Sequence, residues 1–258
     1  MEFLSANLIN TTTQIAVASN TSTVSNIFNR DSYFQYYTDG MNSDLTTTSI
    51  TITFDSTTTI SRLALIDINL KEFSIFYNGA TANSISLTTT GSTVTSSFTG
   101  NAENKMYLRF SSLAVSSITI DMKKTITANE EKRVGLLYIG DLYLSMERVP
   151  EAAGYKPRKN PKQVVHALSD GGTRIHNIRR KWSIDINLDY VGSTLRDDLE
   201  EIYELREPFQ FCPWGTMTSW DGIFFEAVWP GTFDFYEYSD NASVSGYSGK
   251  ISLRETPT

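Results

Sequence analysis

Cysteine and histidine are the residue types that this sequence of 258 residues has least of. The single cysteine, Cys212, excludes an intrachain disulfide framework and leaves too few thiolates for a zinc cluster. His166 and His176 are the only histidines, so most metal, triad and acid–base chemistries would have to be built without this side chain. We therefore expect no metal, no cofactor and no catalysis of these kinds.

Long apolar runs are missing as well. No stretch approaches the roughly 20 apolar residues that a membrane helix needs. The N-terminus, MEFLSANLINTTTQ, has no basic region followed by an apolar core, so no signal peptide is expected. These absences predict a soluble protein that is made in a cytoplasm.

Positive charge is in short supply, with 22 Lys and Arg against 29 Asp and Glu and a formal net charge of −7. Phosphate binding needs a positive surface, so this balance argues against a general nucleic-acid role. The charge is unevenly spread, because residues 155–181 contain a single acid, Asp170, among many cations. These cations are Lys156, Arg158, Lys159, Lys162, Arg174, Arg179, Arg180 and Lys181.

An acidic stretch follows the basic one. After Trp182 come Asp197, Asp198, Glu200, Glu201, Glu204 and Glu207. Two such segments within one chain favour self-complementary assembly, and the alternative interpretation is a solvated loop beside a solvated helix face. The candidate subunit interface therefore combines the basic residues above with Asp197, Glu200, Glu201 and Glu204.

The first half of the chain is rich in Ser, Thr and Asn and alternates with the period of a β-strand. In residues 48–54, Ile50, Ile52 and Phe54 share one face while hydroxyls occupy the other, as in a half-buried strand. Turn residues separate the strands that we expect at residues 48–54, 63–68, 73–77, 84–87, 94–98, 106–110 and 117–122. Short strands at this spacing predict a β-sandwich or jelly roll.

The middle of the chain differs in composition from the first half. The apolar stretch 134–146 is expected to be either the last strand of a first domain or the first strand of a second. The Pro-punctuated residues that follow it predict a long loop or arm. The sequence Ser169-Asp170-Gly171-Gly172 then predicts a hairpin turn between runs 163–168 and 173–178.

The last part of the sequence predicts further strands and one helix. Residues 181–190 alternate cleanly, and further strands are expected at 209–214, 222–229 and 250–253. The helix is expected over 193–207, capped by Ser193 or Thr194 and ended by Pro208. Its apolar stripe consists of Leu195, Leu199, Ile202 and Tyr203.

Several residues could be proposed as catalytic groups, but a purely structural interpretation is stronger for each of them. The helix carboxylates are expected to face water, and Cys212 lies in an aromatic run where a buried, inert thiol is typical. Asp221 and Glu226 lie among tryptophans, which can stack on sugar rings as in a glycosidase, but sequence fixes no distance between the two carboxylates. His166 and His176 are expected to face one another across the hairpin as a polar pair. We predict no enzyme, and we name Trp214 and Trp220 as candidate aromatic contacts.

The stretch 29–79 resembles discoidin or galactose-binding-like jelly rolls. It closes a strand with ITITFD at 50–55, continues with ISRLAL at 60–65 and ends in KEFSIFYNG at 71–79. The resemblance covers roughly residues 15–125. It implies a jelly-roll fold in which variable loops carry any binding function.

The second half resembles phage tail proteins of the tail-tube and distal-tail kind, in which a β-sandwich flanked by one helix packs into rings. The features that carry the resemblance are the strand 181–190, the helix 193–207, PFQF at 208–211 and the closing LRE at 253–255. It implies that the basic arm, residues 155–181, lies on neighbouring subunits.

These features together predict a mainly β fold in three parts. They are a galactose-binding-like sandwich over 1–146, a basic arm and hairpin over 147–181, and over 182–258 the remainder of a second sandwich that carries helix 193–207. The predicted function is a virion structural protein of a phage tail or baseplate, a ring homo-oligomer that also contacts other tail proteins. The alternative is a carbohydrate-binding module that attaches the protein to a glycan on a host or other surface.

Overall fold

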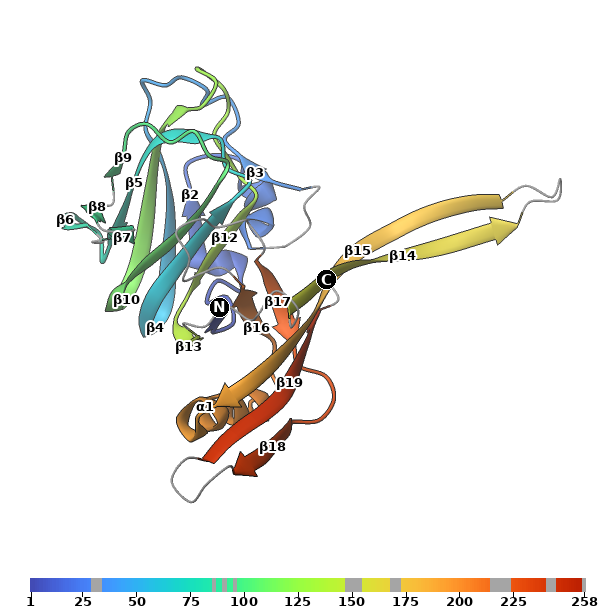
Figure 1. Ribbon diagram of the computed structural model, residues 1–258. Helices are drawn as coiled ribbons and strands as arrows, with labels where there is room; N and C mark the ends of the chain where they lie inside the picture. Colours follow the sequence, from blue (N-terminus) through green and yellow to red (C-terminus); the bar gives the residue numbers. More distant parts are fainter. Residues whose placement is uncertain are drawn as a thin grey trace. The chain divides into compact units, whose positions relative to one another are not determined.

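The computed structural model describes residues 1–28, 34–84, 87–89, 92–94, 97–146, 155–167, 173–213, 224–239 and 245–256. Contacts between residues divide the chain into two compact units. Unit 1 comprises Met1–Phe3 and the described residues of Tyr143–Thr216 and Ile223–Pro257, and unit 2 comprises Leu4–Leu142. Both are built mainly from strands, which confirms the predicted fold class (Figure 1). Among the described residues, no helix is long and apolar enough to cross a membrane.

Unit 2 is a sandwich whose main sheet has the order β12-β4-β10-β5-β6, with β2 on β4 and β9 on β5. Two short 3-10 helices, η1 (Thr12–Gln14) and η2 (Thr21–Ile27), come before the long strands. Two small sheets, β11-β3 and β7-β8, complete the unit. Its strands are β2 (Ile15–Val17), β3 (Tyr36–Tyr37), β4 (Thr48–Ile66), β5 (Leu70–Tyr77), β6 (Ala80–Ser84), β7 (Leu87–Thr89), β8 (Ser92–Val94), β9 (Ser97–Phe98), β10 (Lys105–Thr125), β11 (Arg133–Val134) and β12 (Leu136–Gly140).

The pairing of β4 with β10 creates the sandwich. The antiparallel register shifts between Arg109 and Leu113 and again between Val115 and Ser117, near the exposed middle of β4. Apolar residues before and after this irregular region belong to the same core, so both halves of each long strand pack against it. The sequence predicted separate strands at 48–54 and 63–68 and at 106–110 and 117–122. That division was wrong, because Thr58–Ile60 pair with Leu113–Val115 and the ladder continues.

Unit 1 contains one sheet with the order β13-β1-β16-β17-β19-β15-β14, in which β18 also pairs with β19. Its strands are β1 (Glu2–Leu4), β13 (Leu142–Ser145), β14 (Tyr155–Ala167), β15 (Thr173–Val191), β16 (Phe209–Cys212), β17 (Phe225–Val228), β18 (Asp234–Ser239) and β19 (Ser245–Glu255). The apolar stretch 134–146 supplies strands to both sheets, since β12 belongs to unit 2 and β13 pairs with β1. Met1–Phe3 lie in unit 1, whereas the predicted first domain begins at residue 1.

The helix α1 (Ser193–Glu204) covers the core of unit 1. Its residues Leu199, Ile202 and Tyr203 are buried in one cluster with Ile184 and Ile186 of β15. The predicted apolar stripe is thus confirmed on this face. The predicted cap was wrong, because Gly192 is the N-cap residue and no side chain bonds the helix start. The helix also ends at Glu204 instead of residue 207, and Arg206 then adopts a left-handed φ of 56°.

A long hairpin of β14 and β15 extends from the unit 1 sheet (Figure 1). The sequence predicted a loop before residue 163, but Tyr155–Lys162 form part of β14 with Pro157 and Pro161 included. Proline is tolerated because β14 is an edge strand, which pairs on one side only. The predicted boundary between 181 and 182 falls inside β15, which is continuous there.

Candidate functional site

We call residues 36–44 and 125–134 of unit 2 its loop end. Within it, β3 and β11 form a small two-stranded sheet. Tyr36 pairs with Val134 and Tyr37 pairs with Arg133. Tyr36 is fully buried, and its hydroxyl donates to the Ser19 carbonyl oxygen at 3.1 Å. Tyr37 points the other way, as strand alternation requires, and is 39% exposed. The sheet therefore anchors one tyrosine in the core and presents the next one at the surface.

Charged side chains lie directly beside Tyr37. The Arg133 guanidinium is 3.5 Å from the Glu130 carboxylate, and both side chains are substantially exposed, at 47% and 41%. Asn69 holds the backbone beneath them, since its Oδ1 accepts the Arg133 N–H at 2.8 Å and its Nδ2 donates to the Glu131 carbonyl at 2.8 Å. We call Tyr37, Arg133 and Glu130 the Tyr37 face.

The segment that follows Tyr37 is fixed by several hydrogen bonds. The Lys132 ammonium donates to the carbonyl oxygens of Met41 at 3.1 Å and Ser43 at 3.2 Å. The Asp44 carboxylate accepts hydrogen bonds from the Thr125 N–H at 3.2 Å and the Thr125 hydroxyl at 3.1 Å. Burial opposes ionisation of Asp44, but hydrogen bonds with Thr125 and Asn129 and the nearby Lys132 charge hold its pKa below the ordinary value. The loop end is therefore a tied structure around an exposed face.

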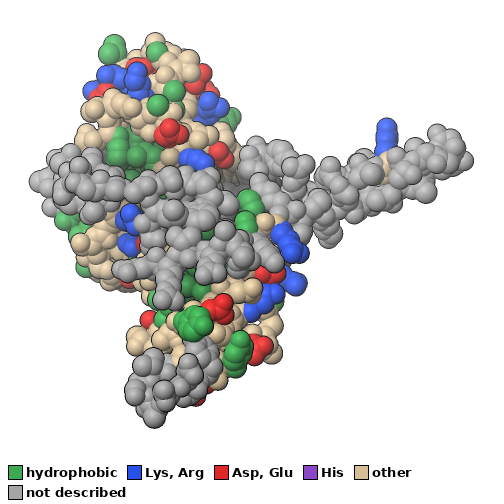
Figure 2. All heavy atoms as spheres, viewed as in Figure 1, with side chains coloured by type: hydrophobic (Ala, Val, Ile, Leu, Met, Phe, Trp, Pro, Cys, Tyr) green, Lys and Arg blue, Asp and Glu red, His purple; other side chains and the backbone are tan. Residues whose placement is uncertain are grey.

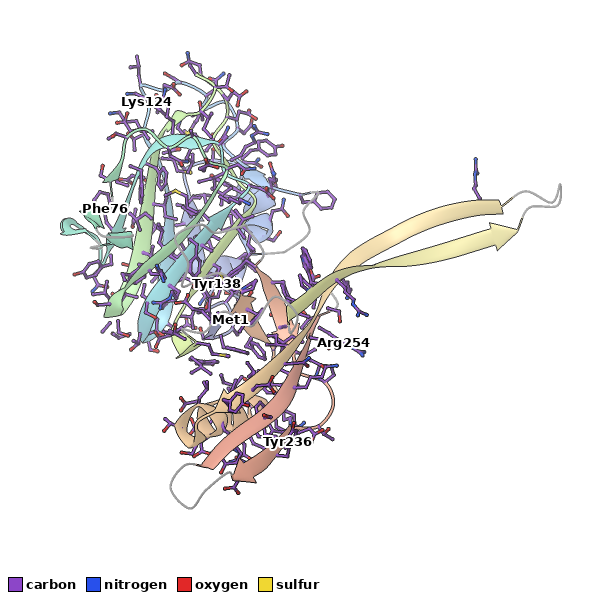
Figure 3. The ribbon with its side chains drawn as sticks, in the orientation of Figure 1. Met1, Phe76, Lys124, Tyr138, Tyr236 and Arg254 are labelled. Carbon is purple, nitrogen blue, oxygen red and sulfur yellow. The ribbon has the colours of Figure 1, made fainter. Side chains whose placement is uncertain are left out.

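A second charged group lies on the same end of unit 2, where β10 finishes near the labelled Lys124 (Figure 3). Glu72 contacts Lys123 at 2.7 Å and Lys124 at 2.6 Å. Hydrogen bonds from these two ammonium groups lower the pKa of Glu72. Acidic and basic side chains are intermingled at this end of the molecule in Figure 2. The surface is thus mixed in charge, which suits a polar ligand better than a polyanion.

The arrangement can bind a ligand that has both an apolar face and hydrogen-bonding groups. Exposed Tyr and Arg side chains are the types that most often carry binding energy. A tyrosine ring stacks on apolar surface, while a guanidinium donates several hydrogen bonds in one plane. No group of three or more His, Cys, Asp and Glu side chains suited to a metal is found among the described residues.

The predicted basic residues are only partly brought together. Arg158 and Arg174 are exposed, and the Lys181 ammonium donates to the Thr256 carbonyl oxygen at 3.1 Å. The backbone register places Lys162 opposite Arg179 and Asn160 opposite Lys181 on the hairpin. The side chains of Lys156, Lys159, Lys162, Arg179 and Arg180 lie outside the described ones.

The predicted acidic residues follow the exposed side of α1. Arg196 forms ion pairs with Asp197 at 2.8 Å and with Glu200 at 2.6 Å, so these two acids already have a partner on their own helix. Glu204 lies 3.8 Å from Arg206, and Glu201 is exposed. Whether the acids and the arm meet in an assembly stays a prediction.

The remaining candidate residues from the sequence do not come together in a site within the described part of the chain. Glu226 on β17 accepts a hydrogen bond from the Thr256 hydroxyl at 2.5 Å, and Cys212 is buried. His166 lies opposite Arg174 and His176 lies opposite Val164, so the predicted histidine pair across the hairpin was wrong. Trp214, Trp220 and Asp221 lie outside the described residues.

No family model matches this chain, and no curated protein matches it. Among solved structures, a chitosan-binding module of a chitosanase/glucanase from Paenibacillus sp. IK-5 matches with 12% identity and a TM-score of 0.39, over 53% of this chain and 98% of that one. The CBM32-6 module of a Clostridium perfringens protein matches with 14% identity and a TM-score of 0.36, over 52% of this chain and 98% of that one. A truncated AlyQ with CBM32 and alginate lyase domains matches with 9% identity and a TM-score of 0.38, over 76% of this chain and 50% of that one. The case for function therefore has to rest on this chain's own residues.

Sequence reasoning missed the Tyr37 face. The dipeptide Tyr36-Tyr37 lies within the stretch that resembles discoidin domains, and the charges at Glu130, Glu131, Lys132 and Arg133 are plain in the sequence. Nothing in the sequence indicates that these two segments pair, because they are far apart in the chain and each strand has only two residues.

Proposed function

We propose that this protein binds carbohydrate through the Tyr37 face of unit 2 and has no catalytic role. The observation that carries the proposal is the cross-strand pair of an exposed tyrosine and an exposed arginine, with Glu130 beside the arginine. A sugar ring has an apolar face of C–H groups and a rim of hydroxyls. Tyr37 can stack on the first, and Arg133 and Glu130 can donate to and accept from the second.

The tied loop end supports the proposal on energetic grounds. A site whose loops become ordered only on binding loses part of its binding free energy to that ordering. The backbone under Tyr37 and Arg133 is already held by Asn69, Thr38 and the β3–β11 pairing, which lowers this cost. The solved structures to which this chain is similar include a chitosan-binding module and a pectin-binding carbohydrate-binding module, which agrees with the proposal without carrying it.

A glycan array probed with the full chain tests the proposal. We expect a defined set of oligosaccharides to bind, and Tyr37→Ala to weaken the strongest of them about tenfold, which corresponds to about 1.4 kcal/mol. Tyr236→Ala, an exposed tyrosine of unit 1 that is 64% exposed, is the matched control and should leave binding unchanged. An array without any specific signal, or equal losses in both variants, would count against carbohydrate binding at this face.

A second candidate function is assembly, and the hairpin of β14 and β15 favours it. Residues 173–182 of β15 pair with β14 alone, because β19 joins β15 only from Ser183 onward. An isolated two-stranded hairpin is marginally stable in water. A neighbouring subunit would stabilise the hairpin, and the exposed Glu201 of α1 offers a charge partner for its cations. In this candidate the protein is a tail or baseplate component of a virion, forms a ring homo-oligomer and contacts other tail proteins.

Charge reversal on the hairpin tests assembly. The triple variant R179E/R180E/K181E is expected to block oligomer formation, measured by size-exclusion chromatography with light scattering. Lys71→Glu changes an exposed lysine of unit 2 and should not affect the mass. A wild-type chain that is monomeric at all concentrations, or a triple variant that assembles normally, would contradict this candidate.

A further inference from the structure

Lys132 is a charged residue with no exposed surface. Its side chain is 0% exposed and is among the largest fully buried side chains in the described part of the chain. Lysine is almost never fully buried without partners, because removing an ammonium from water is costly. Burial accordingly lowers the pKa of Lys132, while the Asp44 charge acts in the opposite direction. The hydrogen bonds of the Lys132 ammonium have to offset this loss of hydration.

The contacts of Lys132 enclose the segment that follows Tyr37. Its backbone N–H donates to the Thr38 hydroxyl at 2.9 Å, and its carbonyl accepts the Thr38 N–H at 3.0 Å. Its ammonium then reaches the carbonyls of Met41 and Ser43 at 3.1 and 3.2 Å. One residue therefore holds both the start and the end of segment 38–43.

The residues next to Thr38 and Lys132 in the chain belong to the Tyr37 face. Thr38 follows Tyr37 directly, and Arg133 follows Lys132 directly. Tyr37 and Arg133 also pair across β3 and β11, which are only two residues long. A ladder this short fixes its register only weakly, and the bonds of Lys132 next to it add to the hold on the backbone that carries the two side chains.

We infer that Lys132 is a positioning residue for the Tyr37 face, whose ammonium ties segment 38–43 to β11 and so sets the tyrosine against the arginine. The inference rests on the proposed carbohydrate binding for its functional consequence, whereas its effect on the backbone can be measured without a ligand. Charge-assisted hydrogen bonds are about twice as strong as neutral ones, which explains why an ammonium suits two backbone carbonyls here.

Three variants test the inference in the full chain. Lys132→Met keeps most of the side-chain volume and removes the donors, Lys132→Arg restores donors, and Lys71→Met is an exposed control. The readouts are amide hydrogen exchange across the chain and affinity for the oligosaccharide that binds the wild type most strongly on the array. We expect Lys132→Met to speed exchange in residues 38–44 and to weaken binding, each about tenfold. Lys132→Arg should recover part of both losses, and Lys71→Met should match the wild type.

The outcomes separate this inference from the proposed function. Lys132→Met with wild-type exchange in residues 38–44 overturns the inference, and so does faster exchange spread evenly over unit 2, which would mark a general stability residue. If no glycan binds the wild-type chain, the proposed function fails and exchange alone decides. Should Lys132→Met fail to fold, Thr38→Val removes the hydroxyl that accepts the Lys132 N–H and donates to the Met41 carbonyl oxygen, and it should give the same local pattern at smaller size.

Discussion

The two units use their longest strands in different ways. In unit 2, β4 and β10 stay paired along most of their length, and apolar side chains from both halves of each strand enter one core. In unit 1, β15 pairs with β19 from Ser183 onward, while residues 173–182 pair only with β14. A long strand can thus enclose a core or carry backbone beyond it (Figure 1). The first use leaves a hydrogen-bonded loop end, and the second leaves a hairpin in which residues 173–182 of β15 pair with β14 and with no other described strand.

The largest expected effect concerns the two cores. Ile120 in unit 2 and Ile251 in unit 1 are both fully buried, in separate hydrophobic clusters. Each change to Ala should lower the free energy of unfolding of its own unit by about 2–5 kcal/mol, because it removes buried methyl groups and leaves a cavity. Differential scanning calorimetry should show two transitions, of which each variant shifts one. A single transition moved equally by both variants would show that the units unfold together.

The next effect compares one glycine in each unit. A Cβ on Gly249 would lie 2.5 Å from the Phe235 ring and 2.7 Å from the Asp234 carbonyl oxygen. A Cβ on Gly135 would lie 2.7 Å from Asp67 Cβ and 3.1 Å from the Ile66 carbonyl oxygen. Each change to Ala should destabilise its unit by about 1–3 kcal/mol through overpacking. Gly100→Ala meets nothing within 4 Å and serves as the control, measured by urea denaturation.

The sequence predicted part of the strand structure of each unit. Alternation predicted the buried faces of β4, β10 and β15 correctly, because a strand with one face in a core must place apolar residues at every second position. It did not show that Asp55–Thr59 continue a strand, since the polar residues there resemble a turn. β18 was also missed, because the strands expected at 222–229 and 250–253 left residues 234–239 unassigned.

The candidate site was less predictable than the fold. Tyr37 and Arg133 become neighbours only through long-range pairing, and periodicity gives no information on which short strands meet. The sequence did indicate the hairpin and its charge, because a turn and a run of cations are local features. Long-range hydrogen bonds such as those of Lys132 and Asn69 carry no local signal.

A smaller effect is expected at Asp44, which ties the loop end of unit 2 to β10. Asp44→Ala removes the acceptor of the Thr125 N–H and hydroxyl, and should lower the free energy of unfolding of unit 2 by about 1–2 kcal/mol. Asp39→Ala alters an exposed carboxylate nearby and is the matched control. If both variants lose equal stability in chemical denaturation, the bonds of Asp44 do not stabilise the loop end.

The smallest effect is the pH response of Glu72. Hydrogen bonds from Lys123 and Lys124 lower its pKa, so its stabilising contribution is present above the ordinary glutamate value of about 4.3 and is lost as the pH falls through the lowered value. Glu72→Gln should flatten the decline of unit 2 stability in that acidic range and leave the response of unit 1 unchanged. Thermal unfolding followed between pH values of about 3 and 6 measures the difference. An unchanged slope would show that the ion pairs of Glu72 with Lys123 and Lys124 contribute nothing to the stability of unit 2.

The most direct measurement is a crystal structure of the full chain with the oligosaccharide that binds most strongly on the array. We expect a sugar ring stacked on Tyr37, with a hydrogen bond of about 2.7–3.2 Å to the Arg133 guanidinium. A sugar bound on unit 1, or on a part of unit 2 away from Tyr37, would contradict the account.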